Sequence, residues 1–323
     1  MLRIMLAGTG LAVASMAVGV QAAGPYPDRP VKVIVPWPAG QATDAATRAV
    51  ADILSQKLGQ PFVVDNRAGA GGAIGSDAAA RSTPDGYTLL AGSTGATTIN
   101  PLITKTNYSA SSFKPVGVIA TVPYVLVSSS QFPAKDARAL IAELRAHPGK
   151  YTFASSGSGS IGHLTAELFL ASTGVKASHV PYKGSGPALV DVMAGRVDFM
   201  FDSVTSILPH LKAGRIHVYG LSSATRSASM PDVPTLAEVT DLKTFDLSAW
   251  IGLLAPAGTP DAVVATLNKQ LQAVVNTADV KRRYLTIGVE TPADTAAASM
   301  LKVMGNEQTR LQALIKQANI KVD

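Results

Sequence analysis

The sequence predicts an α/β protein of two lobes, in which each lobe is a mainly parallel sheet flanked by helices and a ligand cleft lies between the lobes. Apolar runs of strand length alternate with helical repeats from Val31 towards the C-terminus, as in parallel, doubly wound sheets. The runs are numerous enough for two sheets, and each half of the chain begins with a strand, a Gly/Ser-rich loop and a helix. Hydrophobic residues make up 47% of the chain and charged residues 15%, a balance typical of compact globular proteins rather than disordered ones.

The N-terminus has the composition of a secretory signal peptide. Arg3 precedes a small, apolar stretch from Ile4 to Val20, and Val20-Gln21-Ala22 fits a small-residue cleavage site. A membrane anchor fits less well, because the stretch is short and rich in Gly, Ala and Ser. The absence of cysteine suits an oxidising export compartment. We therefore expect residues 1–22 to be a signal peptide that is cleaved near Ala22.

The charge distribution argues against nucleic-acid binding. The formal net charge is +6, which suits an anionic ligand. However, the basic residues are scattered, and the densest run, Lys281-Arg282-Arg283, is not interleaved with aromatic residues. The five histidines are far apart in the sequence and no cysteine is present, so we expect no metal site and no cofactor.

The predicted strands are short apolar runs, many of them rich in β-branched residues. They are Val31–Val35, Phe62–Asp65, Thr88–Ala91, Val116–Ala120, Val125–Val127, Tyr151–Ala154, Ser178–Pro181, Val197–Phe201, His217–Leu221 and Trp250–Ala255. The predicted helices have apolar residues at helical spacing or flanking stop signals. They include one that ends at Gly59, a short one that ends near Arg81, and the ranges 136–146, 187–194, 260–276 and 293–317.

Two segments are candidate crossings between the lobes. They are Thr121-Val122-Pro123 and the loop-rich stretch 222–248. If the chain crosses at both, residues 23–122 and 248–323 form a discontinuous first lobe, and residues 123–247 form a second lobe inserted into it. Two crossings of this kind would make a hinge with a ligand cleft between the lobes.

The loop from Pro36 to Asp44 is the first candidate for ligand binding. It connects the strand Val31–Val35 to a helix whose apolar residues recur at helical spacing up to Leu58. A strand that feeds a helix through a Pro/Gly-rich turn leaves free backbone N–H groups at the start of the helix, and these groups favour an anion such as a carboxylate. In the same loop, Asp44 and Arg48 have the i,i+4 spacing of a local ion pair.

Two further segments of the first lobe lie at the ends of predicted strands. The glycines of the segment from Asn66 to Gly75 indicate close approach, either of backbone to a ligand or of backbone to the neighbouring loop. Ser93 and Thr94 follow the strand Thr88–Ala91, at the edge where open α/β sheets bind ligands. We interpret them as hydrogen-bond donors to a carboxylate.

The segment from Ser155 to His163 opens a helix in the second lobe. Gly157, Gly159 and Gly162 spell a dinucleotide fingerprint, but the next strand ends without an acidic residue that could hold a ribose. The Gly-x-Ser-x-Gly elbow of a serine hydrolase is absent, and no acid in the sequence is placed to orient a histidine base. A hydrolase is therefore the least favoured reading, and a hydroxyl-rich helix start suited to a carboxylate remains.

Two charged residues at strand ends complete the candidate site. Lys183, in the loop Tyr182–Pro187, either pairs with an anion or is a solvated lysine. Asp202 directly follows Val197–Phe201, and it either accepts a hydrogen bond from an amine or hydroxyl of the ligand or caps the following helix.

These motifs together resemble the periplasmic solute-binding receptors of tripartite tricarboxylate transporters, also called the Bordetella uptake family. The resemblance covers essentially the whole mature chain. Its strings are Tyr26–Val31, Pro38-Ala39-Gly40 with Asp44 and Arg48, Asn66–Gly72, Pro84–Leu90, His179–Gly184, Gly195–Asp198 and Ala255–Pro260. The chain departs from the family pattern at Gln41, where the family has a second glycine, and at Trp37, where it often has Phe.

The resemblance implies a two-lobed flytrap fold that closes on a small organic carboxylate in the periplasm and catalyses no reaction. It implies two partners, one large and one small membrane subunit of an importer, and we expect the receptor itself to be a monomer. A sensor that reports its ligand to a membrane kinase is the alternative. The residues expected to bind the ligand are Trp37, Ala39, Gly40, Gln41, Thr43, Asp44, Ser93, Thr94, Ser155, Gly157, Ser158, Ser160, Tyr182, Lys183 and Asp202.

Overall fold

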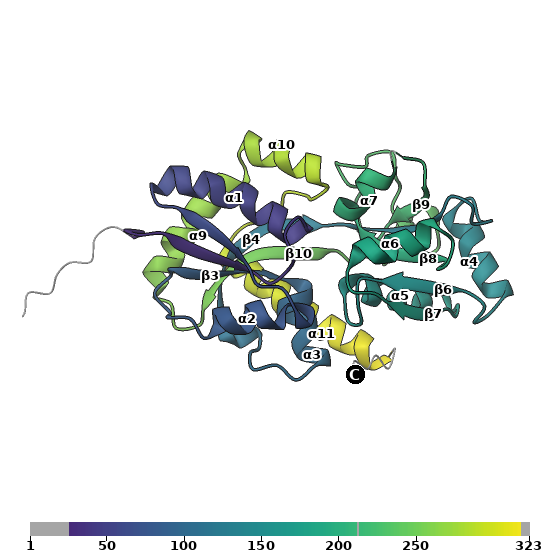
Figure 1. Ribbon diagram of the computed structural model, residues 1–323, viewed down its shortest axis with the longest axis horizontal. Coiled ribbons are helices and arrows are strands. Elements are labelled where there is room, and N and C mark those ends of the chain that lie inside the picture. The colour runs from purple at the N-terminus through teal and green to yellow at the C-terminus, as the bar shows by residue number, and fades with distance from the viewer. Residues whose placement is uncertain (1–25, 212, 318–323) are drawn as a thin grey trace, which may run out of the picture.

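The computed structural model describes residues 26–211 and 213–317, so the expected signal peptide lies outside the described residues. The chain forms two five-stranded sheets that lie side by side along the long axis of the molecule (Figure 1). In spatial order, the first sheet contains β2 (Phe62–Asn66), β1 (Val31–Val35), β3 (Thr88–Ser93), β10 (Ala249–Pro256) and β4 (Phe113–Val122). The second contains β7 (Ser178–Pro181), β6 (Thr152–Ser155), β8 (Phe199–Ser203), β5 (Tyr124–Ser129) and β9 (Ile216–Leu221).

Each sheet has four strands that point in one direction and a fifth strand that is reversed. In the first sheet β1 pairs in parallel with β2 and β3, whereas β10 is antiparallel to both β3 and β4. In the second, β6 is parallel to β7 and β8, whereas β5 is antiparallel to β8 and β9. The reversed strands are β10 and β5. Each of them is the strand at which the chain arrives from the other sheet. All other strands therefore end at the edge that faces the opposite sheet, where ligand sites of open sheets form.

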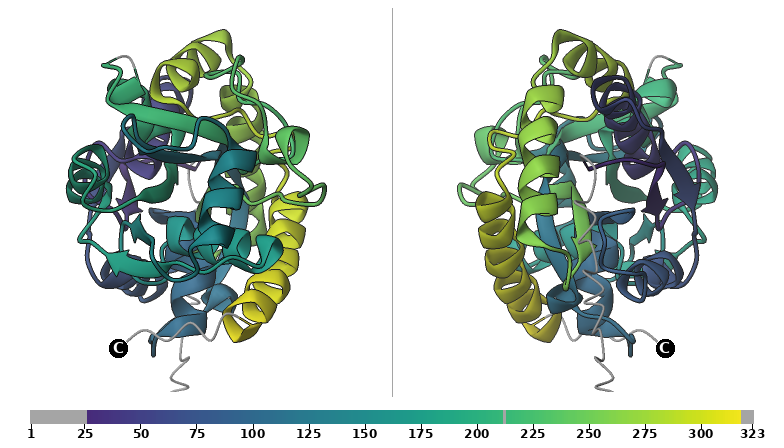
Figure 2. Two further views of the ribbon diagram at one scale, coloured as in Figure 1. Left: turned by 90° about the vertical axis from the view of Figure 1, so that its right-hand side faces the viewer. Right: turned by 90° about the vertical axis from the view of Figure 1, so that its left-hand side faces the viewer.

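Helices cover both faces of each sheet (Figures 1 and 2). They are α1 (Ala42–Leu58), α2 (Ala73–Ala80), α3 (Asn100–Ile103), α4 (Ala137–Ala146), α5 (Ile161–Thr173), α6 (Ser185–Met193), α7 (Val204–Leu211), α8 (Leu236–Val239), α9 (Asp261–Val275), α10 (Ala278–Ile287) and α11 (Ala297–Gln317). The core of the first lobe packs α1 and α9 against its sheet through residues such as Val50, Leu54 and Leu271. Within residues 26–211 and 213–317, no helix has the length and hydropathy needed to span a bilayer.

All ten strands expected from the sequence are present, with ends that differ by at most three residues. The largest helical difference is α10, which was not among the helices predicted from the sequence. Its start is capped by Thr277, whose hydroxyl accepts from the amide of Val280, and it buries Val280 and Tyr284. Its apolar face is formed by Val280, Tyr284 and the half-buried Ile287. The basic run Lys281-Arg282-Arg283 separates these residues in a helix of only ten residues, so the apolar pattern is short.

The expected strand Val197–Phe201 is shifted, and the shift corrects one interpretation. The strand β8 runs to Ser203, so Asp202 is a strand residue paired with Val125 rather than the cap of a helix. The capping position before α7 belongs to Ser203, whose Oγ accepts from the amide of Ser206 at 3.3 Å. The side chain of Asp202 is therefore not used as a helix cap, and it is available for a ligand at the edge of the sheet.

The two sheets are connected at several points. β4 ends at Val122 and β5 begins at Tyr124, so Pro123 alone separates strands of different sheets. The chain returns through residues 222–248 to β10. The helix α11 packs on β4, contacts α5 of the second lobe, and extends along one side of the molecule (Figure 2). Its Arg310 guanidinium donates to the backbone carbonyl of Asp246.

Candidate functional site

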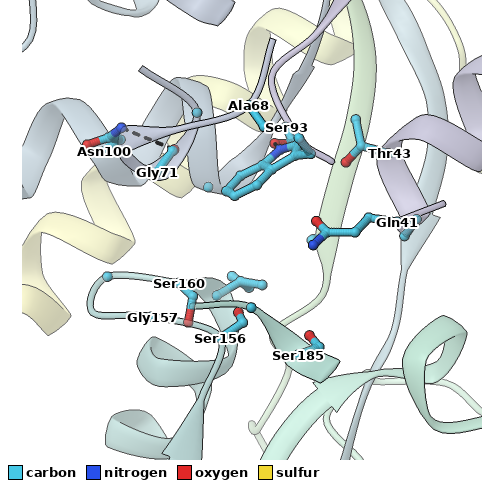
Figure 3. A pocket seen from close by; sticks show the side chains of 18 of the residues that line it. Gln41, Thr43, Ala68, Gly71, Ser93, Asn100, Ser156, Gly157, Ser160 and Ser185 are labelled. Carbon is cyan, nitrogen blue, oxygen red and sulfur yellow. Dashed lines mark hydrogen bonds between the residues drawn. The ribbon is translucent and has the colours of Figure 1, made fainter. Parts of the chain in front are cut away.

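A cavity of about 1030 Å³ lies between the facing edges of the two sheets. Figure 3 shows Gln41, Thr43 and Ser93 on one side of the gap, opposite Ser156, Ser160 and Ser185 on the other. The walls come from the loops that follow β1, β2 and β3 in one sheet and β6, β7 and β8 in the other, and from the ends of the crossing strands β4, β5 and β10. The charged residues on the wall are Lys105, Lys183 and Asp202.

The loop after β1 presents the N-terminus of α1 to the cavity. Ala42 and Thr43 are the first residues of the helix and both line the wall. The first amide groups of a helix have no intrahelical acceptor and carry its partial positive charge. This end of the cavity is therefore electropositive without using a charged side chain.

A buried polar network holds this loop in place. Asp44 accepts from the Gly40 amide at 2.9 Å and from the Arg48 guanidinium at 3.0 Å. Asn66, at the end of β2, donates to the carboxylate of Asp44 and to the carbonyl of Trp37. Burial alone would raise the pKa of Asp44, but the bonds from Arg48, Gly40 and Asn66 together lower it. Asp44 is thus an ionised anchor for the loop, and the local pair with Arg48 expected from the spacing is present.

Trp37 forms part of the wall beside the loop after β3. Its indole Nε1 donates to Ser93 Oγ at 2.9 Å, and a Cβ added to Gly95 would lie 3.1 Å from the indole ring. Glycine at this position therefore lets the ring lie against the backbone. Thr94 is fully buried, and its hydroxyl accepts from the amide of Trp250 at 3.0 Å and contacts Glu307.

In the second sheet, the loop after β6 leads into α5. Ile161, the first residue of α5, lines the cavity together with Ser158 and Ser160. Ser160 caps the helix, because its Oγ accepts from the His163 amide at 3.3 Å. A Cβ on Gly162 would meet the carbonyl oxygen of Phe201 at 2.5 Å, so glycine there allows α5 to pack directly on β8. This second helix start faces the first across the cavity.

Ser155 and His179 lie as close together as a nucleophile and its base, but the burial of Ser155 and the pKa of His179 do not suit catalysis. The distance from Ser155 Oγ to His179 Nε2 is 2.7 Å. Ser155 is fully buried, so a substrate in the cavity cannot reach it. Burial and the neighbouring His163 lower the pKa of His179 to about 3, which makes its imidazole a poor base at neutral pH. The pair is suited to holding a loop rather than to hydrolysis.

Asp202 is a buried acid at the cavity wall. Its Oδ1 accepts from Ser185 Oγ at 3.0 Å and from the Ser203 amide at 2.7 Å, whereas Oδ2 has no partner within the described part of the chain. Burial raises its pKa to about 6, an effect that the bonds from Ser185 and Ser203 only partly offset. A buried acceptor without a donor is costly, and this one lies beside a space where a donor could be supplied.

The residues expected from the sequence divide into two groups. Nine of them line the cavity: Trp37, Gln41, Thr43, Ser93, Gly157, Ser158, Ser160, Lys183 and Asp202. Six are absent from the cavity wall in this structure: Ala39, Gly40, Asp44, Thr94, Ser155 and Tyr182. Gly40, Asp44 and Ser155 form bonds within the loops. Tyr182 donates its hydroxyl to Asp191 at 2.6 Å, and the expected donor Thr94 is directed towards Glu307 instead.

Several wall residues were not among the residues expected to bind the ligand, although Ala68–Ala73 belong to the segment from Asn66 to Gly75, for which approach to a ligand was one of two interpretations. They are mainly Ala68–Ala73, Asn100, Ile103–Lys105, Val122, Tyr124, Ser156, Ser185, Ser206 and Ala249–Ile251. Val122 and Tyr124 flank Pro123, which lies in a segment predicted to cross between the lobes. That prediction could therefore also have indicated these two residues of the cavity wall. Asn100 gave no such signal, because its position depends on the bonds that it donates to the carbonyls of Ala70 and Gly71.

Known proteins are similar to this chain in both sequence and fold. A family described as "Tripartite tricarboxylate transporter family receptor" matches residues 46–320. A protein of the tcbD-tcbE intergenic region of Pseudomonas sp. strain P51 is 38% identical, over 99% of this chain and 96% of its own. Rpa4515 of R. palustris, solved with adipate, is 34% identical with a TM-score of 0.84, over 92% of this chain and 99% of its own. MatC of Rhodopseudomonas palustris, solved with malate, is 31% identical with a TM-score of 0.79, over 90% of this chain and 100% of its own.

The family match spans most of the chain, and these relatives align along nearly their whole length. Their two-lobed fold is the one found here. The chain belongs to the receptor family of the tripartite tricarboxylate transporters.

Proposed function

We propose that the mature protein is a periplasmic receptor that binds a small organic carboxylate between its lobes and delivers it to the large and small membrane subunits of a tripartite importer. In this proposal it catalyses no reaction. The division into lobes follows the two sheets, with residues 23–122 and 248–323 in one lobe and 123–247 in the other. The ligand is bound by the expected loop residues that line the cavity and is enclosed as the lobes close.

One observation supports the proposal most strongly: helices that follow strands of opposite sheets begin at the same cavity. The amide ends of α1 on one side and of α5 and α6 on the other adjoin the same space. Lys105 and Lys183 add positive charge from opposite walls, and Asp202, the acid among the described residues of the wall, has a raised pKa. Such an environment favours an anion over a neutral sugar or a cation. Adipate and malate, found with two relatives, are small carboxylates.

Calorimetry on protein freed of bound ligand by unfolding and refolding tests the binding step. Mono-, di- and tricarboxylates, amino acids, neutral sugars and simple cations are titrated in turn. We expect at least one carboxylate to bind with a Kd of about 1 μM or lower, which corresponds to about −8 kcal/mol. Binding of a sugar or a cation with no binding of any carboxylate would refute the proposal.

Uptake by cells tests the delivery step. Cells that carry the receptor and both membrane subunits should accumulate the radiolabelled carboxylate identified by calorimetry, and cells without the receptor should not. Unchanged uptake after removal of the receptor, together with loss of a transcriptional response to the carboxylate, would assign the protein to sensing instead.

A further inference from the structure

Two histidines are stacked directly beneath the second-lobe part of the cavity wall. The ring centroids of His163, on α5, and His179, on β7, are 3.8 Å apart, and their planes differ by 8°. Phe153 on β6 continues the stack, with its ring centroid 4.9 Å from that of His179. His163 is 5% exposed. Neither ring lines the cavity, so neither is placed to contact a ligand directly.

Each ring forms a hydrogen bond that holds the ligand loop from Ser155 to Ser160. The Gly159 amide donates to His163 Nδ1 at 3.0 Å. His179 Nε2 lies 2.7 Å from Ser155 Oγ, which in turn lies 3.0 Å from the carbonyl of Gly157 and 3.2 Å from its amide. The loop is thus connected to the stack near both of its ends.

The contact with the Gly159 amide fixes the tautomer of His163, and the contacts of Ser155 bear on the tautomer of His179. Because His163 Nδ1 accepts a bond, its proton must be on Nε2, which faces Glu167 Oε1 at 3.6 Å. Ser155 Oγ lies within bonding distance of the Gly157 carbonyl, the Gly157 amide and His179 Nε2, and it has one proton. We assign that proton to the Gly157 carbonyl, in which case His179 donates from Nε2 to Ser155 Oγ. The His163 ring is neutral because its Nδ1 accepts, and the His179 ring is neutral at neutral pH because burial lowers its pKa to about 3. Stacking at this distance is therefore free of the repulsion that two imidazolium charges would create.

Backbone hydrogen bonds couple the ligand loop to the loop that follows β7. The Gly184 amide donates to the Ser156 carbonyl at 3.1 Å, and the Tyr182 amide donates to the Ser155 carbonyl at 3.0 Å. His179 lies on β7, and the residues that follow this strand, Lys183, Gly184 and Ser185, line the cavity. A change in the stack would move both loops.

We propose that His163 and His179 are positioning residues that hold the Ser155–Ser160 loop in its ligand-binding conformation through the acceptor atom His163 Nδ1 and the donor atom His179 Nε2. This inference rests on the proposed carboxylate binding. Loss of the acceptor leaves the Gly159 amide without its buried partner, and the loop amides and hydroxyls that face the ligand lose their fixed orientation.

Two substitutions at His163 separate the hydrogen bond from the stacking. His163→Phe keeps an aromatic ring beside His179 but has no acceptor, whereas His163→Asn loses the ring but can place its amide oxygen where Nδ1 lies. The full chain of each variant is titrated by calorimetry with the carboxylate that binds best to the wild type. We expect His163→Phe to weaken binding about tenfold or more and His163→Asn to recover most of that loss.

His217→Phe is the matched control. His217 lies in the same lobe, donates one bond from Nε2 to the Lys135 carbonyl at 2.9 Å and contacts an aromatic ring, but it does not line or support the cavity. Wild-type affinity is expected for it, with melting curves confirming that all variants are folded. Equal weakening by Phe and Asn at position 163, or wild-type affinity of His163→Phe, would overturn the inference. If the wild type binds no carboxylate, the proposed function itself fails.

Direct observation of the tautomers does not depend on any variant folding. Long-range ¹H–¹⁵N correlation spectra of the wild-type imidazoles should show the proton of both His163 and His179 on Nε2. A proton on Nδ1 of His163 would make acceptance from Gly159 impossible and would overturn the inference even in a protein that binds carboxylates.

Discussion

At the scale of single residues, the cavity depends on a few buried polar groups whose environment sets their chemistry. Asp44 is held ionised by its hydrogen bonds, whereas burial raises the pKa of Asp202 to about 6 and that of Glu307 to about 7. Gln41 is different, because it stands at the start of α1 without forming a side-chain cap bond. Its side chain reaches into the cavity (Figure 3).

Gln41→Gly should change the ligand preference with little effect on the empty protein. The backbone at this position is extended and no cap bond is lost, so the free energy of unfolding should stay within about 0.5 kcal/mol of the wild type. The ranking of carboxylates by calorimetry should change, since the side-chain amide is removed from the wall. A marked fall in the melting temperature with an unchanged ranking would mean that Gln41 is structural.

Asp202→Asn should discriminate between classes of ligand. The substitution keeps an acceptor for Ser185 and Ser203 but turns the unpartnered oxygen Oδ2 into a donor. Carboxylates that also carry an amine or hydroxyl should bind about tenfold more weakly, and plain dicarboxylates should change little. Asp241→Asn, at an exposed position of the same lobe, serves as the control. Equal effects on both classes of ligand would contradict a donor-recognising role.

Glu307→Gln should remove a loss of stability that the wild type undergoes between about pH 4.5 and pH 7. Burial raises the pKa of Glu307 to about 7, although Trp250, Thr94 and Arg310 lower it in part. Because the folded pKa is above the model value of 4.5, this contribution to stability is fully present below pH 4.5 and is lost as the pH rises through about 7.

In urea titrations, the difference in unfolding free energy between Glu307→Gln and wild type should rise by about 3 kcal/mol from pH 4.5 to pH 8.5. Glu143→Gln is the control, because the pKa of Glu143 is lowered, mainly by its bond from Tyr151, and its contribution changes in a more acidic range. A difference that does not depend on pH would show that the pKa of Glu307 is not raised in the folded protein.

At the scale of helices and strands, the sequence predicted the sheets better than the details of the site. Strands such as Val31–Val35 were recognisable because β-branched runs are bounded by Pro, Gly and Asp. The loops after β1 and β6 could be predicted as site loops because a helix follows each of them. The direction of Thr94 could not, since it depends on Glu307, more than two hundred residues later. Likewise, the stack of His163 on His179 joins a helix to a strand across the sheet edge.

Gly162→Ala should destabilise the second lobe. An added Cβ would lie 2.5 Å from the carbonyl oxygen of Phe201, so α5 would have to move away from β8. We expect the free energy of unfolding to fall by about 2 kcal/mol, measured by urea titration. Gly186→Ala, in α6, adds a Cβ with no atom within 4 Å and should leave stability unchanged or raise it by up to about 1 kcal/mol. Similar effects of both substitutions would mean that the close packing at Gly162 does not limit stability.

At the scale of the whole molecule, the arrangement of the two sheets explains why one cavity has two similar walls. Each sheet directs the carboxyl ends of four strands towards the other, and the reversed strands β5 and β10 carry the crossings. Each wall therefore offers strand ends followed by helix starts. In lobe one Asn66 and Asp44 hold the ligand loop, and in lobe two the proposed histidine stack does so.

The central claim is that amide groups from both lobes bind the same anion. The most direct measurement is a set of amide ¹H–¹⁵N TROSY spectra recorded while a carboxylate is titrated into the ligand-free protein. Resonances of Ala42 and Thr43 and those of Ser158 to Gly162 should shift together, with one shared Kd. Shifts confined to one lobe, or carboxylate binding that leaves both sets of amides unchanged, would contradict the account.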